Sequence, residues 1–283
     1  MIFDSRPCEL GEGPLWHPIR EQLFWFDILN RTLHSQSGDM PLSWTFPAMT
    51  SAAGWTGTDT LLLASESGLS GFDIVTGRLD LLCAAGSPAT RSNDGRADRQ
   101  GGFWFGTMGK RAEQGLGAIW RWYRGELRQL FPGITIPNSI CFAPDGRAAH
   151  FSDTVTGRVM KVALDAQGWP VGQPQVWLDL TADGLNPDGA VIDAEGRFWN
   201  AQWGAGRVAA YAPDGSFLSA VETPGAPHSS CPAFGGQDMK TLFITTALEH
   251  LDADARVGHP ASGQVFAFPG IAPGLPEPQV ILP

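Results

Sequence analysis

A unit of about 40 to 50 residues recurs along this chain, and the repeat constrains the fold more than any other feature. Each unit has a short apolar segment, a polar turn of the Asp-x-x-Gly type and a second segment rich in aromatic residues. The clearest copies are "DGRADRQGGFWFGTMG" (94–109), "SICFAPDGRAAHFSDT" (139–154), "DGAVIDAEGRFWNAQWG" (188–204) and "SCPAFGGQDMKTLFITTA" (230–247). Weaker copies are "EGPLWHPIREQLFWFDIL" (12–29) and "SAAGWTGTDTLLLASESG" (51–68). A second hairpin pattern, such as "GRVAAYAPDGSFLSA" (206–220), follows in several of the units.

Two hairpins per unit predict a four-stranded antiparallel sheet, which is the size of one propeller blade. One position recurs at steps of 39, 42, 45, 50 and 42 residues, and we place it just ahead of each first strand: Glu12, Ser51, Asn93, Asn138, Asp188 and Ser230. A single sheet cannot bury both apolar faces, whereas six sheets packed around an axis can. We therefore predict an all-β fold, a six-bladed β-propeller with four-stranded antiparallel blades around a central channel, as one domain over residues 1–283. A sandwich with a small second domain is the alternative.

Composition supports many short strands joined by tight turns. The 283 residues include 35 Gly, 22 Pro and 11 Trp, and 17% are charged, which favours an all-β protein over a helical one. The four cysteines are widely spaced without a CxxC motif, so we expect free buried thiols in a reducing compartment. No segment has the length of a membrane span, and the first residues lack a signal pattern, so we expect a soluble cytoplasmic protein. The net charge of −10 argues against nucleic acid and favours a small neutral ligand.

Polar residues share one phase of the repeat. Glu12, Asn93, Asn138 and Asp188 occupy equivalent positions, so in a propeller they are expected to converge on one mouth of the channel. Clustered carboxylates repel one another, and hard divalent cations prefer carboxylate and amide oxygens. The alternative is that Asp-Gly and Asn-Asp-Gly are ordinary turn signals. The shared phase favours a cation site.

At these residues the chain resembles a known family, the senescence marker protein, regucalcin and gluconolactonase family of six-bladed propeller sugar-lactone hydrolases. The segments that carry the resemblance are "LGEGPLWH", "RSNDGRADRQGGFWFGTMG", "NSICFAPDGRAAHFSDT", "NPDGAVIDAEGRFWNAQWG" and "CPAFGGQDMKTLFITTA", and they extend from residue 10 to about 247. The resemblance implies that Glu12, Asn138 and Asp188 ligate one divalent metal ion. It also implies that Arg91 and Asn93 bind substrate hydroxyls and ring oxygens. One departure is Ser139, where the family often has glycine after the asparagine.

The activity implied by this resemblance is hydrolysis of a sugar lactone, such as glucono-, xylono-, arabinono- or galactonolactone, to the aldonic acid in carbohydrate catabolism. A divalent ion can stabilise charge on the carbonyl oxygen or lower the pKa of a bound water. Asp188 is the candidate general base. Asp94 follows Asn93, and we group it with the substrate-binding residues, where it would orient Arg91. Oxygen ligands admit Ca, Mg, Mn, Zn or Fe(II) alike.

Two other functions are compatible with the same residues. One is a calcium-binding propeller without turnover, and the other is hydrolysis of different esters, such as organophosphates. Arg91 and Asn93 favour the enzyme, because an ion buffer has no use for substrate-type donors. Motifs of other chemistries are missing: the chain has no HExxH, no GxSxG and no phosphate-binding Gly-x4-Gly-Lys loop.

Overall fold

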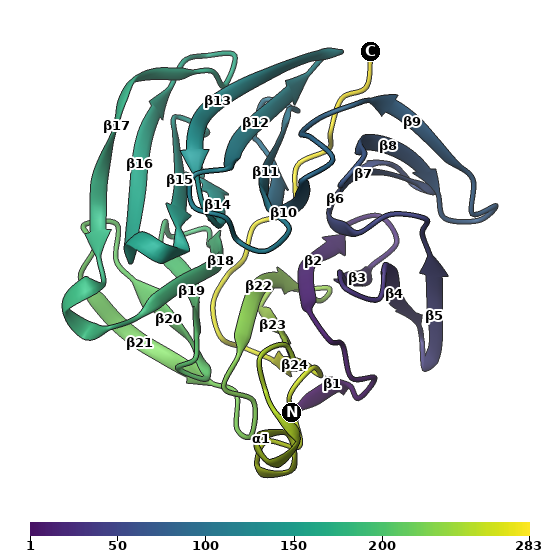
Figure 1. The fold of residues 1–283 in the computed structure, drawn as a ribbon, viewed down its shortest axis with the longest axis vertical. Helices are drawn as coiled ribbons and strands as arrows, with labels where there is room; N and C mark the ends of the chain where they lie inside the picture. Colours follow the sequence, from purple (N-terminus) through teal and green to yellow (C-terminus); the bar gives the residue numbers. More distant parts are fainter.

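The computed structural model describes residues 1–283 and consists of six four-stranded antiparallel sheets arranged around a central axis (Figure 1). Each inner strand lies against the inner strands of the two neighbouring blades, and the sixth lies against the first, so the ring is closed. The chain is therefore a six-bladed β-propeller, as the repeat predicts, and not a sandwich.

The strands of each blade follow one another outward from the axis. The innermost strands are β2 (Gly11–His17), β6 (Thr50–Gly57), β10 (Thr90–Ala97), β14 (Pro137–Phe142), β18 (Asn186–Ile192) and β22 (Ser229–Gly235). The second strands are β3 (Gln22–Asp27), β7 (Thr60–Ser65), β11 (Phe103–Gly109), β15 (Ala148–Asp153), β19 (Phe198–Trp203) and β23 (Thr241–Thr246). The third strands are β4 (Thr32–Ser37), β8 (Gly68–Asp73), β12 (Gly117–Tyr123), β16 (Arg158–Leu164), β20 (Arg207–Tyr211) and β24 (Val265–Phe268). The outer strands are β5 (Met40–Thr45), β9 (Leu79–Cys83), β13 (Glu126–Ile134), β17 (Pro170–Asp179), β21 (Phe217–Glu222) and β1 (Ile2–Asp4).

The sixth blade takes its outer strand from the other end of the chain. β1 pairs antiparallel with β24, with Ile2 opposite Phe266. This pairing ties residues 2–4 to residues 265–268 by backbone hydrogen bonds and so holds the ring shut.

Apolar side chains fill the space between neighbouring blades. The structure contains six such clusters, one at each interface between blades. Between the first and second blades, Phe24, Phe26, Trp55 and Phe72 are all buried. Burial of apolar surface contributes about 25 cal/mol per Å², so each blade is stabilised by the two blades beside it.

The Asp-x-x-Gly pattern forms the hairpin turns between first and second strands. The backbone amide of Gly101 donates to the carbonyl of Asp98 (3.1 Å), and Gly101 has a φ of 88°, a left-handed conformation that favours glycine. The Asp98 carboxylate accepts the amides of Gln100 (3.0 Å) and Gly102 (2.8 Å). Asp193 accepts two amides of its own turn in the same way. These aspartates are turn residues, as their pattern predicts.

The polar residues at the recurring position lie inside the inner strands, so their placement ahead of these strands was wrong. Every inner strand shifts its register at this point. In β18, pairing with β19 stops at Pro187 and resumes at Ala190. Asp188 and Gly189 therefore form a bulge, which bends the strand and redirects side chains. The Pro-Asp-Gly sequence is not a turn here.

Gly189 allows close packing between two blades and is not required by a turn. A Cβ atom on Gly189 would lie 2.4 Å from the Sγ atom of Cys231 on β22. Only glycine lets the bulge of the fifth blade approach the sixth blade this closely. The bulge and this packing together set the direction of the Asp188 side chain.

Residues 271–283 cross the centre of the disc after β24, as the yellow segment in Figure 1 shows. Backbone hydrogen bonds tie this segment to four blades, joining Ala194 to Pro273, Gly274 to Met239, Val280 to Trp55 and Ile281 to Gly101. Ala194, Met239 and Gly101 lie beyond the last residues of their inner strands, and Trp55 lies close to the end of β6. The segment therefore covers the end of the channel opposite to the one where the inner strands begin.

A buried ion pair anchors the crossing segment. Glu277 pairs with Arg96 of β10, and the two side chains are 8% and 9% exposed. The indole Nε1 of Trp55 also donates to the backbone carbonyl of Glu277 (2.8 Å). The Glu277 carboxylate thus attaches residues 271–283 to the inner strand β10.

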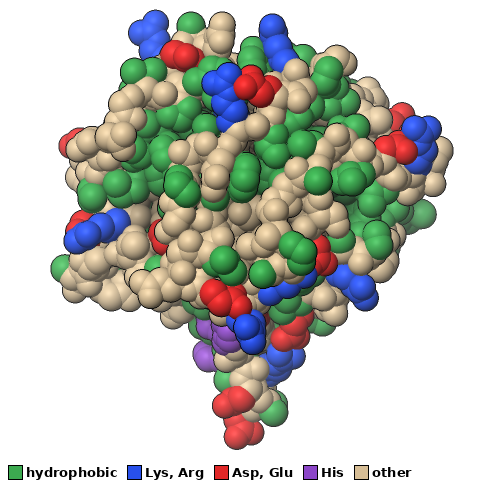
Figure 2. Space-filling view, turned by 45° about the horizontal axis from the view of Figure 1, so that its top comes forward, with side chains coloured by type: hydrophobic (Ala, Val, Ile, Leu, Met, Phe, Trp, Pro, Cys, Tyr) green, Lys and Arg blue, Asp and Glu red, His purple; other side chains and the backbone are tan.

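Helices are few and short: η1 (Thr154–Thr156), η2 (Thr181–Asp183) and α1 (Ala253–Gly258). None is long and apolar enough to cross a membrane. The segment around α1 projects from the edge of the disc (Figures 1 and 2). On the face shown in Figure 2, acidic and basic side chains are interspersed and do not gather into a basic patch.

Candidate active site

A cavity of about 300 Å³ lies at the end of the channel where the inner strands begin. All six blades, or the loops beside them, contribute to its lining. The structure brings five residues singled out from the sequence into this one cavity: Glu12, Arg91, Asn93, Asn138 and Asp188. They come from the first, third, fourth and fifth blades.

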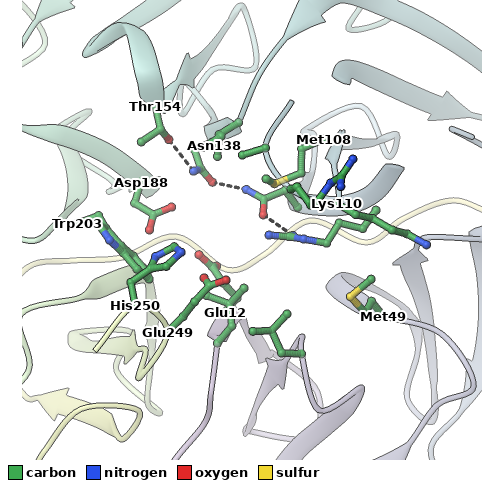
Figure 3. A pocket seen from close by; sticks show the side chains of 17 residues that line it. Glu12, Met49, Met108, Lys110, Asn138, Thr154, Asp188, Trp203, Glu249 and His250 are labelled. Atoms are coloured by element: carbon green, nitrogen blue, oxygen red, sulfur yellow. Dashed lines mark hydrogen bonds between the residues drawn. The ribbon is translucent and has the colours of Figure 1, made fainter. Parts of the chain in front are cut away.

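Carboxylates gather on one side of the cavity. Glu12 and Asp188 are each only 5% exposed, and Figure 3 shows their carboxylates pointing toward each other and toward Glu249. The backbone amide of Gly13 donates to Oε2 of Glu12 (2.8 Å). This bond orients the Glu12 carboxylate and leaves its Oε1 atom open to the cavity.

The amide of Asn138 is held in one orientation. Its Nδ2 atom donates to the Thr154 hydroxyl (2.8 Å), and that hydroxyl donates to the carbonyl of Pro187 (2.8 Å). Its Oδ1 atom accepts a hydrogen bond from Nδ2 of Asn93 (3.0 Å) and lies on the cavity side (Figure 3). An amide oxygen has two lone pairs, so Oδ1 of Asn138 retains one for a cation.

Arg91 and Asn93 form the next link of this network. Nη1 of Arg91 donates to Oδ1 of Asn93 (2.8 Å) and to the carbonyl of Ser92 (2.9 Å). Both N–H groups of Asn93 are used, toward the carbonyl of Pro137 and toward Asn138. Asn93 can therefore only accept a hydrogen bond from a ligand, whereas the other N–H groups of Arg91 remain free to donate.

Asp94 is not part of the cavity lining, which corrects its prediction as a substrate-binding residue. Its Oδ2 atom accepts the amide of Ile140 on the next blade (2.7 Å), and its Oδ1 atom accepts the amide of Gly95 (2.8 Å). It does not contact Arg91, because the bulge in β10 directs consecutive side chains into different surroundings. Asp94 is a link between the third and fourth blades.

Aromatic rings form part of the cavity wall. Trp203 and His250 line the cavity. The ring of His228 stacks on Trp203 with a centroid distance of 4.3 Å and an interplanar angle of 9°, and His250 contacts Trp203 edge-on. His228 thus supports the wall from behind. An aromatic wall in a cavity with several oxygen donors suits a ligand that has both C–H faces and hydroxyl groups.

Burial changes the acid–base properties of the cavity residues. Burial, reinforced by the charge of Asp94, raises the pKa of Glu12 to about 8. Burial also raises the pKa of Asp188 well above its usual value, and the charge of Glu12 adds to this effect. Burial lowers the pKa of Arg91. The carboxylates are therefore costly to ionise together unless a positive charge lies between them.

The donor set is suited to a hard divalent cation. Glu12, Asp188 and Asn138 offer only oxygen atoms, and two of them are buried carboxylates that lack a paired lysine or arginine. Such a set matches the oxygen ligation of Ca²⁺ and Mg²⁺ and admits Mn²⁺, Zn²⁺ and Fe²⁺. These three residues could hold one such ion.

Cation binding is expected to stabilise the protein more at high pH than at low pH. A carboxyl group whose pKa is raised by folding holds its proton to higher pH in the folded protein than in the unfolded chain. The cation-free protein therefore loses stability as pH rises through about 8, the pKa of folded Glu12. A bound cation removes this penalty because it favours the ionised forms. We expect the increase in Tm caused by saturating calcium or manganese, relative to chelated protein, to grow between roughly pH 5 and pH 8.

Thermal melts of both samples across this pH range measure the effect. Buried histidines are present in both samples, so His150, whose pKa burial lowers to about 3, cancels in the difference. A cation-induced increase in Tm that is constant with pH would contradict the carboxylate ligation.

Sequence reasoning did not find Glu249, which follows β23 and lines the cavity. Its counterparts at the ends of other second strands also line it, including Met108, Thr154 and Trp203. A second recurring position of the same repeat, at the end of each second strand, could have indicated these residues. We used only the first phase, at the start of each inner strand.

A second group of metal-type side chains lies near the first blade and is less suited to an ion. Cys8, Asp27 and His34 place their ligand atoms within 4.8 Å of one another. However, both Asp27 oxygens already accept backbone amides, and Nη1 of Arg6 lies 3.4 Å from Nδ1 of His34. Burial raises the pKa of the Cys8 thiol, which keeps it protonated. All four cysteines are free, as expected, but Cys83 is only half-buried.

Comparison with known proteins relates the whole propeller to one family. Residues 10–248 match the family described as the SMP-30/Gluconolactonase/LRE-like region. The chain is 38% identical to a protein of Rhizobium meliloti (strain 1021) provisionally named sugar lactone lactonase, over 91% of this chain and 89% of that one. It is 33% identical to the 6-deoxy-6-sulfogluconolactonase of Pseudomonas putida, over 96% and 95%.

A solved structure agrees with this relation. The calcium-binding protein regucalcin from Agrobacterium tumefaciens strain C58 superposes with a TM-score of 0.96 at 41% identity, over 99% of this chain and 96% of that one. Sequence and structure agree over nearly the full length of the chain. The chain therefore belongs to the SMP-30/gluconolactonase/LRE-like family.

Proposed function

We propose that this protein hydrolyses a sugar lactone to the corresponding aldonic acid, using one divalent cation held by Glu12, Asn138 and Asp188. The observation that carries the proposal is the composition of the cavity, which combines the oxygen donors of a cation site with the free N–H groups of Arg91. The names of several relatives, which include lactonases of sugar lactones, support the same substrate class.

When bound, the cation supplies Lewis-acid stabilisation of the negative charge that develops on the lactone carbonyl oxygen. The protein residues do the rest. Arg91 donates hydrogen bonds to hydroxyl or ring oxygens of the sugar, and Asn93 accepts one from a hydroxyl. Trp203 and His250 pack against the C–H face of the ring and exclude bulk water from one side.

Asp188 is the proposed proton acceptor. As a water oxygen bonds to the carbonyl carbon, its proton passes to a carboxylate oxygen of Asp188. The bond between the carbonyl carbon and the ring oxygen then breaks, and the ring oxygen takes up this proton to become a hydroxyl. The products are an open-chain aldonic acid and an enzyme whose residues are unchanged.

The proposal is tested by a pH-indicator assay on a panel of aldonolactones. Chelated protein is expected to open no lactone above the spontaneous rate, and single divalent ions restore turnover when added back. Phosphotriesters in parallel wells test the alternative ester chemistry. A protein that binds an ion but opens no lactone with any cation would be a binding propeller, and the proposal would be wrong.

A further inference from the structure

Ser139 follows the proposed ligand Asn138 and has an unusual backbone conformation. Its φ is 58°, in the left-handed region that non-glycine residues rarely adopt. The residue is fully buried in the bulge of β14, where pairing with β15 stops at Asn138 and resumes at Cys141. A strained conformation of this kind persists only where the surroundings hold it in place.

The hydroxyl of Ser139 reaches the neighbouring blade. Its Oγ donates to the backbone carbonyl of Asp188 (2.6 Å). Asn200 on β19 donates from Nδ2 to the same carbonyl (3.0 Å) and to Oγ of Ser139 (3.2 Å), and the hydroxyl of Ser152 also donates to that Oγ (3.0 Å). The bulge with one proposed ligand is thus hydrogen-bonded to the backbone of another.

The same contact recurs at every second interface around the channel. Oγ of Ser51 in the second blade donates to the carbonyl of Asn93 in the third (2.5 Å). Oγ of Ser230 in the sixth blade donates to the carbonyl of Gly11, just before Glu12, in the first (2.5 Å). We call these three contacts the serine clips, made by Ser51, Ser139 and Ser230. Each ends on the backbone of a proposed site residue or of the residue before it.

The interfaces between the clips are held differently. A Cβ atom on Gly13 would lie 2.1 Å from the carbonyl oxygen of Ser51, so the first and second blades approach without side chains. Between the fifth and sixth blades, Gly189 packs closely against the side chain of Cys231. Between the third and fourth blades, Asp94 accepts the amide of Ile140. The clips are therefore specific to three interfaces and are not a general feature of blade packing.

We infer that Ser139 is a positioning residue for the cation site, a role that rests on the proposed function. Its hydroxyl fixes the peptide plane after Asp188, and this plane sets the direction of the Asp188 side chain relative to Asn138. Glycine would adopt the same φ without strain, so backbone geometry alone does not favour serine here. The hydrogen bond to Asp188 is what the serine adds.

The inference is tested with Ser139→Ala and Ser139→Gly, each of which removes the hydroxyl. The alanine variant keeps the backbone strain, and the glycine variant relieves it. If Ser139→Ala folds poorly, Ser139→Gly can therefore still test the hydrogen bond. Ser35→Ala is the matched control, because the buried Oγ of Ser35 donates to the carbonyl of Leu23 at the same 2.6 Å but within the first blade and away from the cavity.

Calorimetric titration with calcium alone and with manganese alone gives the first measurement. Both Ser139 variants are expected to bind the ion about tenfold more weakly than wild type, because each loses one hydrogen bond that preorganises the site. Ser35→Ala is expected to lower Tm and to leave the ion Kd unchanged. If both Ser139 variants kept the wild-type Kd while lowering Tm as the control does, Ser139 would have only a structural role.

Hydrogen exchange of the cation-free protein gives a second, independent measurement. Amides of peptides that cover 137–142 and 186–192 are expected to exchange faster in both Ser139 variants than in wild type and Ser35→Ala. Unchanged exchange in these peptides would overturn the clip between the fourth and fifth blades. Wild-type protein that binds neither ion would instead refute the cation site and with it the positioning role of Ser139, and the exchange data would then test only the contact between the fourth and fifth blades.

Discussion

Replacing Asp188 by alanine is expected to lower lactone turnover by at least about a thousandfold, because in the proposed mechanism its carboxylate is both the proton acceptor and a cation ligand. The side chain is buried, opens into the cavity and faces Glu12 across it. The pH-indicator assay with saturating cation measures the loss, and calorimetric titration shows whether the ion still binds.

Asp188→Asn separates the two roles. The amide keeps an oxygen for the ion but cannot take a proton, so turnover is expected to be lost while weakened ion binding remains. Asp145→Ala is the matched control, because Asp145 stands in an identical Pro-Asp-Gly sequence that forms an exposed turn, where it accepts the amide of Arg147 (3.0 Å). It is expected to retain full turnover. Turnover retained by Asp188→Ala with the ion bound would assign the proton transfer to another group, such as Glu249, a further carboxylate of the cavity lining.

Replacing Glu277 by alanine is expected to lower Tm by about 10 °C, since breaking a buried ion pair by removing one partner costs about 3–5 kcal/mol. The variant leaves the guanidinium of Arg96 buried in the channel with the carbonyl of Pro232 (3.3 Å) as its remaining hydrogen-bond acceptor. It also weakens the attachment of residues 271–283 to four blades. Differential scanning calorimetry of the two proteins measures the change.

Two further variants make this result interpretable. Asp80→Ala breaks the exposed pair with Arg78, whose side chains are 52% and 74% exposed, and is expected to shift Tm by less than about 2 °C. Combining Arg96→Met with Glu277→Met removes both charges and is expected to recover most of the lost stability. A Glu277→Ala melt as close to wild type as that of Asp80→Ala would show that the pair does not hold the crossing segment.

The propeller could be predicted from sequence because a repeat encodes its own geometry. Units such as 139–154 and 188–204 carry the same order of apolar segment, turn and aromatic segment. Identical units must pack in equivalent ways, and only a closed ring buries both faces of each sheet. The pairing of β1 with β24 and the path of residues 271–283 could not be predicted, because neither segment belongs to the repeat.

Aspartates before glycine show the limit of local patterns. Asp145 is a turn residue, whereas Asp188, in the same Pro-Asp-Gly sequence, lies in a bulge within β18. Local conformational preference is the same for both. The difference arises from the strand pairing on either side and from the contact of Gly189 with Cys231. The local pattern failed in the same way for Asp94, which was predicted to bind substrate. The bulge in β10 turns its carboxylate toward the amide of Ile140 instead.

The sequence by itself determined the blade architecture and which polar residues share one phase of the repeat, because hydrophobic periodicity and turn chemistry are local properties that add up along the chain. Only the tertiary structure decided how those residues are aimed. Asp94 points away from the cavity toward Ile140, and Ser139 donates a hydrogen bond to the backbone of Asp188. These outcomes depend on contacts between blades, whose residues lie about 40 or more positions apart, and no local pattern records such contacts.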